Sequence, residues 1–313
     1  MGSSYREINY SLRPAKNIER KMLAEAIHRM ASFGAIDTYR YIGFGSIYFT
    51  DFYLFHRYLG IKDMISIERN VTNGDRFLFN LPFKCIRLEL GNSKDVLPTL
   101  NWDTRTILWL DYDGQLTKDV FLDIETFVSN ATSGSVIIIT VQSNPSYKNP
   151  NHLERLIENV GKNKVPINIK SSDLDGWGLA NVNRQIIDNE IAELLRKRNA
   201  ARAKPNYIYQ QLFNFHYQDG AQMLTVGGII FQETMRSQYQ SCEFNKLDFV
   251  KVGEGAYKIE IPQLTFRELR HLNAQLPATD VKKIEAKGIP ESDLRKYMGI
   301  YRFFPSFAET DVS

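Results

Sequence analysis

The sequence predicts an α/β protein built on a doubly wound, mostly parallel sheet. Short apolar segments alternate with helical patterns over residues 39–142, and these segments are continuously apolar. Strands of that kind are buried on both faces, as in a parallel sheet with helices on each side. Further on, two β-rich segments flank Asp219-Gly220, a strong turn signal that predicts a closing antiparallel hairpin. We therefore expect a seven-stranded sheet.

The strands follow one another at regular intervals. Five are expected before the middle of the chain, at residues 39–45, 64–68, 85–90, 106–111 and 135–142. Helical periodicity places helices at 17–30, where Asn17 is the expected N-cap, at 47–59 and at 120–131. Residues 209–217 and 223–231 form the two strands of the hairpin.

Three parts are expected along the chain. Residues 1–35 form an N-terminal segment with one helix, and residues 36–238 form the main α/β domain. Within that domain, polar helical sequence at 144–205 indicates an insertion covering the sheet edge. Residues 239–313 indicate a small α+β module, with a short strand at 257–261 and a helix opened by Thr265. A winged-helix-like fold is the candidate for this module.

Composition excludes several classes of protein. The 39 basic and 36 acidic residues leave a net charge of +3, which gives no bulk attraction to nucleic acid or anionic membranes. An aromatic content of 12% is too high for a disordered chain. Two cysteines are too few for a disulfide framework or a Cys-rich metal site. The longest apolar run, residues 136–141, is too short to cross a bilayer. We expect a cytoplasmic protein.

Two strand ends indicate a nucleoside site. The first strand runs into Gly43-Phe44-Gly45-Ser46, where the missing Cβ atoms let a ligand approach the backbone. The second ends at Glu68, 23 residues after Gly45, where a carboxylate can accept both hydroxyls of a ribose.

Polar residues also follow the next two strands. Asn92 and Ser93 come after the third strand, and Asp111 and Asp113 end the fourth. Ligands of open α/β sheets bind at the carboxyl ends of central strands. Two neighbouring carboxylates there need a partner, a proton or an ion.

Over residues 36–232 this order of motifs resembles the class I S-adenosylmethionine-dependent methyltransferase fold, and in particular the poorly characterised O-methyltransferases of bacteria. The resemblance implies S-adenosylmethionine as cofactor. It assigns cofactor contacts to Gly43, Gly45, Ser46, Glu68, Asn92, Ser93 and Asp111, and catalysis to Asp111 and Asp113. The acceptor stays unidentified.

The chain departs from the family pattern at several positions. Tyr41 stands where an acid is usual, and Ile47 replaces a third glycine. The methionine end of the cofactor must then be held elsewhere, with Arg13, Lys16 and Asn144 as candidates. Some related enzymes hold a divalent cation at an Asp-x-Asp segment. This chain follows its fifth strand with Gln142-Ser143-Asn144 instead of Asp-Asn, so we expect no metal.

Other functions stay open. A nicotinamide dinucleotide site would need a small residue in place of Tyr48. Asn144-Pro145-Ser146-Tyr147 resembles an amino-methyltransferase motif, but follows the fifth strand rather than the fourth. The fold could also serve as a silent cofactor- or partner-binding module. A nucleic-acid methyltransferase is the remaining alternative, using the C-terminal module and a basic cluster formed by Arg196, Lys197, Arg198, Arg202 and Lys204.

Overall fold

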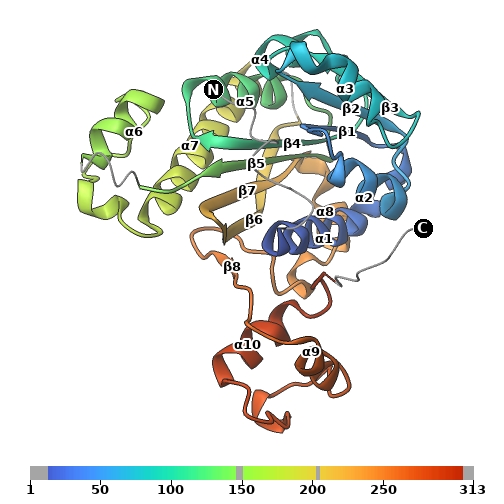
Figure 1. Cartoon of the computed structure of the whole chain (residues 1–313). Coiled ribbons are helices and arrows are strands. Elements are labelled where there is room, and N and C mark those ends of the chain that lie inside the picture. Colours follow the sequence, from blue (N-terminus) through green and yellow to red (C-terminus); the bar gives the residue numbers. More distant parts are fainter. Residues whose placement is uncertain (1–12, 146–150, 202–204, 306–313) are drawn as a thin grey trace.

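One eight-stranded sheet organises the chain (Figure 1). The computed structural model describes residues 13–145, 151–201 and 205–305. The strand order is β3-β2-β1-β4-β5-β7-β6-β8. The sheet separates two apolar cores, and helices cover both of its faces. This confirms the doubly wound α/β fold.

The first five strands pair in parallel, as their continuous apolar sequences predict. They are β1 (Arg40–Gly43), β2 (Asp63–Glu68), β3 (Ile86–Leu90), β4 (Thr106–Gln115) and β5 (Ser135–Gln142). The hairpin follows as β6 (Tyr207–Asp219) and β7 (Ala221–Gln232), with the turn at Gly220. Strand β7 inserts antiparallel between β5 and β6, which is the arrangement that the class I methyltransferase resemblance implies.

Alternate residues of β4 show how the helices are divided between the two faces. Ile107 and Trp109 point into the core shared with α1 (Pro14–His28) and α2 (Thr50–Leu59). Leu108 and Leu110 point into the opposite core, with α5 (Lys118–Asn130) and α7 (Gly178–Ala200). The same part of the chain also contains the short helices α3 (Gly74–Phe79), α4 (Ser93–Val96) and α6 (His152–Val160). The carboxyl ends of the central strands therefore lie between two helical layers.

Two expectations about helices need correction. Helix α7 lies on a face of the sheet beside α5, because Ile187, Ile191 and Leu194 are buried in that core (Figure 1); it does not merely cover the sheet edge. Helix α1 begins at Pro14 with Arg13 as N-cap, so Asn17 lies within the helix. Proline suits the first helical position because it lacks the amide hydrogen that would be unpaired there.

The C-terminal residues add a strand to the main sheet. Strand β8 (Tyr257–Ile259) pairs in parallel with β6, so the sheet has eight strands rather than seven. Beyond it, α9 (Phe266–Asn273) and α10 (Glu291–Ile300) share a small core of their own. Thr265 caps α9 in a capping box with Glu268. The short helix α8 (Arg236–Ser241) leads into this region. Strand β8 is the only strand in the described residues 239–305, so a winged helix, which needs a strand hairpin, is not seen there. No described helix is long and apolar enough to cross a membrane.

Candidate active site

The ends of β1 and β2 are joined through Glu68. Its Oε1 accepts hydrogen bonds from the Ser46 backbone N–H at 2.7 Å and from the Ser66 hydroxyl at 3.1 Å. The Ser66 oxygen in turn accepts the Gly45 N–H at 3.1 Å. Burial raises the pKa of Glu68 to about 7, although these hydrogen bonds oppose the shift. The motif glycines and the strand-end acid therefore lie side by side.

The two glycines are required by the protein's own packing. A Cβ at Gly43 would lie 2.5 Å from the hydroxyl oxygen of Tyr41, and one at Gly45 would lie 2.4 Å from the ring of Phe49. Either contact is far inside van der Waals distance. Ser46 follows with a φ of 54°, and its hydroxyl is buried with no hydrogen-bond partner. The loop therefore holds an unpaired polar atom next to Glu68.

An acid reaches the end of β1 from another element. The Tyr41 hydroxyl donates a hydrogen bond to Asp51 of α2, and both side chains are buried. Burial raises the pKa of Asp51, while the nearby Arg20 guanidinium opposes the shift. A buried carboxylate, ten residues later in the chain than Tyr41, thus lies beside β1. Sequence patterns gave no signal for Asp51.

The loop after β3 also reaches Glu68. The Gly91 N–H donates to the Glu68 carbonyl oxygen at 3.0 Å, which places Asn92 beside the end of β2. Asn92 is exposed at the N-cap position of α4. Ser93 points elsewhere: its hydroxyl donates to Asp123 of α5 at 2.5 Å, and Tyr112 donates to the same carboxylate oxygen. Ser93 is therefore already engaged within the protein.

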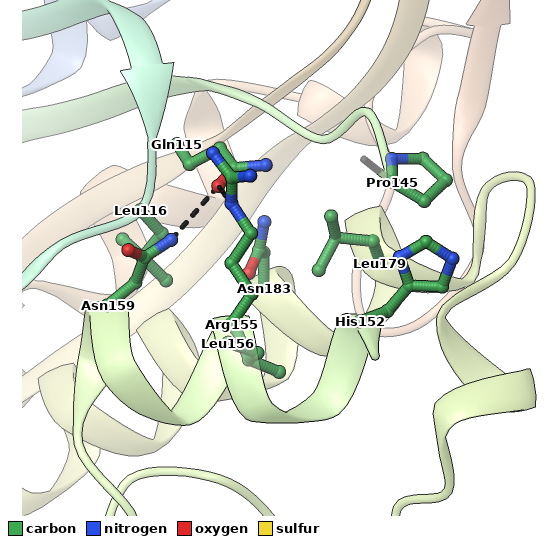
Figure 2. A pocket seen from close by; sticks show the side chains of 9 residues that line it. All are labelled: Gln115, Leu116, Pro145, His152, Arg155, Leu156, Asn159, Leu179 and Asn183. Atoms are coloured by element: carbon green, nitrogen blue, oxygen red, sulfur yellow. Dashed lines mark hydrogen bonds between the residues drawn. The ribbon is translucent and has the colours of Figure 1, made fainter. Parts of the chain in front are cut away.

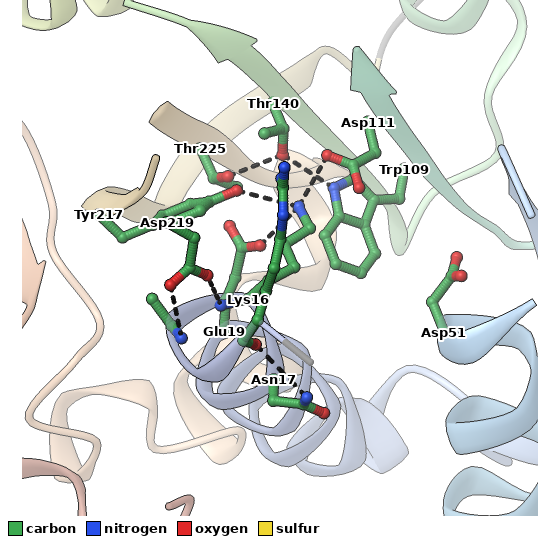
Figure 3. Close-up of polar contacts among 12 residues, drawn as sticks. Lys16, Asn17, Glu19, Asp51, Trp109, Asp111, Thr140, Tyr217, Asp219 and Thr225 are labelled. Atoms are coloured by element: carbon green, nitrogen blue, oxygen red, sulfur yellow. Dashed lines mark hydrogen bonds and ion pairs between the residues drawn. The ribbon is translucent and has the colours of Figure 1, made fainter. Parts of the chain in front are cut away.

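Asp111 belongs to a buried polar cluster between α1 and the sheet (Figure 3). The Lys16 ammonium lies 2.7 Å from Asp111 Oδ1 and 2.7 Å from Glu19 Oε2, and it donates to the Tyr217 hydroxyl at 3.1 Å. It also lies 4.5 Å from the centre of the Trp109 ring. Burial raises the pKa of Glu19, and the charge of Lys16 opposes the shift. Lys16 is therefore already engaged with partners within the protein.

Asp113 lies two residues further along β4 and is exposed. The pairing of β4 with β5 is irregular between Asp111 and Gln115, so this end of the strand departs from the regular sheet. Strand β1 separates β4 from β2, which puts the two carboxylates roughly 10 Å across the sheet from Glu68. Strands β2 and β4, on either side of β1, thus present acids at one sheet edge.

Other sequence candidates have structural partners. The Asn144 carbonyl accepts a hydrogen bond from Gln115 at 3.2 Å, and its side chain accepts the Gln222 N–H at 3.4 Å. Ser146 and Tyr147 of the Asn-Pro-Ser-Tyr segment lie outside the described residues. Across the described ranges, no group of three His, Cys, Asp or Glu side chains is placed to hold a metal ion.

The basic cluster does not form a single surface in the described part of the chain. Arg198 is buried and donates to the carbonyl oxygens of Val128 and Ala131 at the end of α5. Lys197 is exposed and paired with Glu193. Arg202 and Lys204 lie outside the described residues. Arg198, the most buried of the cluster residues that the structure describes, thus holds α7 against the end of α5.

Three solved structures show weak similarity to the chain. The O-methyltransferase TomG from Streptomyces achromogenes is 14% identical over 66% of this chain and 79% of its own, with a TM-score of 0.36. TYW2 from P. horikoshii is 12% identical over 72% and 66% of the two chains, with a TM-score of 0.41. Spermidine synthase from Thermotoga maritima is 8% identical over 77% and 68%, also with a TM-score of 0.41. None of the curated proteins matches the chain.

A family model gives the decisive comparison. It matches residues 8–312, which includes the sheet, the acids at its edge and the C-terminal helices. The chain belongs to the family described as "Putative O-methyltransferase", and it is a methyltransferase by that membership.

Proposed function

We propose that this protein transfers a methyl group from S-adenosylmethionine to a hydroxyl oxygen of a small molecule. The observation that carries the proposal is the junction of Glu68 with Ser46 at the adjoining ends of β2 and β1. Family membership supports the reaction class. The two free cysteines are consistent with a reducing bacterial cytoplasm, where we place the protein.

The residues at this junction fit the cofactor. No described residue uses Glu68 Oε2 in a hydrogen bond, so this oxygen can accept from the ribose hydroxyls, and the unpaired Ser46 hydroxyl lies in the adjoining loop. We assign Gly43, Gly45 and Asn92 to the walls of the same site. Asp51 is our candidate for holding the ammonium of the methionine end, since it brings a carboxylate to the end of β1. Ser93, engaged with Asp123, is a weaker candidate.

We assign the reaction at the acceptor hydroxyl to side chains at the carboxyl end of β4. When bound there, S-adenosylmethionine would supply a methyl group on a positively charged sulfur, and transfer of that methyl to the acceptor oxygen would leave the electron pair of the broken carbon–sulfur bond on sulfur. Asp113, exposed at the strand end, is the candidate base that takes the proton of the acceptor hydroxyl. Asp111, tied to Lys16, is assigned to positioning and to negative charge beside the cofactor.

Calorimetry with S-adenosylhomocysteine tests the cofactor assignment. Glu68→Ala removes a charge-assisted contact and should weaken binding by about 1.5–3 kcal/mol. Glu125→Ala, an exposed position on α5, is the matched control and should bind like the parent protein. Binding of a nicotinamide dinucleotide in place of S-adenosylhomocysteine would refute the proposal, as would a Glu68→Ala variant with unchanged affinity.

A further inference from the structure

The hollow between the exit of β5 and helices α6 and α7 is nearly filled by its own side chains (Figure 2). Gln115 Oε1 accepts hydrogen bonds from Arg155 Nε at 3.1 Å and from Asn159 Nδ2 at 3.0 Å, which ties the end of β4 to α6. The space left in the hollow is about 20 Å³, enough for roughly one water molecule. This hollow therefore has no room for a larger ligand, whereas the sheet edge at β3 is open to another protein chain.

Strand β3 forms one edge of the sheet, and no described strand pairs with its outer side. Gly91, just after β3, donates its N–H to the Glu68 carbonyl of β2 at 3.0 Å. Because the backbone groups of successive strand residues point to opposite sides, those of Arg87 and Glu89 also point toward β2, and those of Leu88 point away from it. The outward N–H and C=O groups of an edge strand are a template on which another strand can pair.

Apolar side chains next to this edge are exposed. Helix α3 leads into β3 and lies beside it (Figure 1). The two elements are in contact, because a Cβ at Gly74 would lie 2.9 Å from a methyl carbon of Leu90. On the same helix Leu78 is 54% exposed and Phe79 is 88% exposed, and Leu90 is 40% exposed. Single exposed apolar side chains are ordinary, but a group of them on adjoining elements is typical of an interaction surface.

The charges on β3 fit a second copy of the same strand. Arg87 and Glu89 lie two residues apart on one face of the strand, with Arg87 Nε 3.0 Å from Glu89 Oε1. In an antiparallel pair centred on Leu88, each Arg87 lies opposite Glu89 of the other copy, and Ile86 lies opposite Leu90. A slip of two residues in either direction would oppose Arg87 to Arg87 or Glu89 to Glu89, and like charges directly opposite are destabilising. The charges therefore favour the one register in which all residues of the strand are paired.

We infer that two copies of this protein join edge to edge through β3, so that their two eight-stranded sheets become continuous. The N–H and C=O groups of Leu88 exchange hydrogen bonds across the two-fold axis, and the Leu90 N–H donates to the Ile86 carbonyl of the other copy. Opposite residues of an antiparallel pair share a face, so the two α3 helices lie on the same side of the joined sheet and cover each other's apolar side chains. A two-fold contact of this kind closes on itself and leaves no free edge at β3.

Sedimentation equilibrium of the full chain, without added cofactor, tests this inference. The mass of the parent protein should approach twice 36.2 kDa as its concentration rises through the micromolar range. Arg87→Glu and Glu89→Arg each replace both attractive pairs across the junction by repulsive ones, so each should weaken self-association at least about tenfold. Arg267→Glu, an exposed control on α9, should associate like the parent.

A mixture of the two variants separates pairing from folding. Arg87→Glu makes the edge wholly acidic and Glu89→Arg makes it wholly basic, so an equal mixture should form a mixed dimer about as stable as that of the parent. A folding defect in either variant would not be repaired by mixing. A parent protein that stays monomeric throughout the micromolar range would overturn the inference. So would single variants that dimerise as tightly as the parent, or a mixture that stays monomeric while both variants keep the parent's melting temperature.

Discussion

At the scale of single residues, the place of a side chain in the fold was easier to predict from the sequence than the groups that surround it. Glu68 could be placed at a strand end near Gly45 by counting residues, since parallel strands end at the same edge of a sheet. Its burial and its raised pKa come from Ser66, Ser46 and the loop around them, which spacing alone does not reveal. The sequence also did not predict the hydrogen bond between Tyr41 and Asp51, because Asp51 has the features of an ordinary residue in the first turn of a helix.

The raised pKa of Glu68 predicts that cofactor binding depends on pH. A carboxylate can accept hydrogen bonds from both ribose hydroxyls, whereas in the protonated acid one oxygen carries the hydrogen and acts as a donor. With a pKa of about 7 in the free protein, affinity for S-adenosylhomocysteine should be constant above pH 8 and fall below pH 7. The limiting slope is about tenfold per pH unit. Glu68→Gln should bind more weakly and show no such slope, as calorimetry from pH 5.5 to 8.5 can measure. Parallel pH profiles for the two proteins would show that Glu68 does not titrate in this range.

At the scale of elements, the strands could be predicted from the sequence, but the contacts between elements far apart in the chain could not. The apolar runs that became β2 and β5 are local features, and their bounds were close to those expected. By contrast, the contact of Lys16 with Asp111 joins residues that are 95 positions apart in the sequence. A lysine is ordinarily predicted to be exposed, because lysines are rarely buried. The end of the hairpin contributes as well: Asp219 accepts the backbone N–H of Lys16 at 2.9 Å. Helix α1 is thus fixed to the sheet edge by charges that only the fold brings together.

Lys16 should therefore contribute strongly to stability. Lys16→Met leaves Glu19 and Asp111 close to each other without a compensating cation, and breaking a buried ion pair in this way costs about 3–5 kcal/mol. The free energy of unfolding, measured in urea, should fall by that order. Lys118→Met, at an exposed position of α5, should change little.

A second variant tests the physical reason for that loss. Lys16→Met combined with Glu19→Leu removes the fully buried carboxylate as well, and should recover part of the lost stability. A single variant as stable as the Lys118→Met control would show that the cluster does not hold α1. A double variant that recovers none of the lost stability would show that the loss comes from altered packing rather than from uncompensated charge.

At the scale of the whole molecule, the C-terminal residues are tied to the main sheet at its outer edge. Strand β8 pairs with β6, and Lys258 lies opposite His216 in that pairing. The ring of Trp177, just before α7, stacks on His216 with 4.7 Å between ring centres. A three-residue strand without strong periodicity gives a weak sequence signal, so its place in the sheet could not be predicted. His216 consequently lies where β6, β8 and the start of α7 meet.

This junction predicts how the whole fold responds to acid. Burial and the charges of Lys258 and Arg184 lower the pKa of His216 to about 4, below its usual value of 6.5. The unfolded chain therefore binds a proton between pH 6.5 and 4 that the folded chain does not, so stability falls as the pH falls through this range, by up to about 3 kcal/mol. Above pH 6.5 the contribution is fully present.

His216→Phe removes the titrating group while keeping a flat ring against Trp177. Both nitrogens of His216 are buried without partners, so the substitution breaks no hydrogen bond and should leave stability at pH 7.5 nearly unchanged. Urea unfolding at pH 7.5, 6.0 and 4.5 should then show a smaller loss on acidification for His216→Phe than for the parent protein. The exposed His28→Phe serves as the control and should follow the parent curve. Equal losses for all three proteins would place the acid sensitivity of the fold outside the β6–β8 edge.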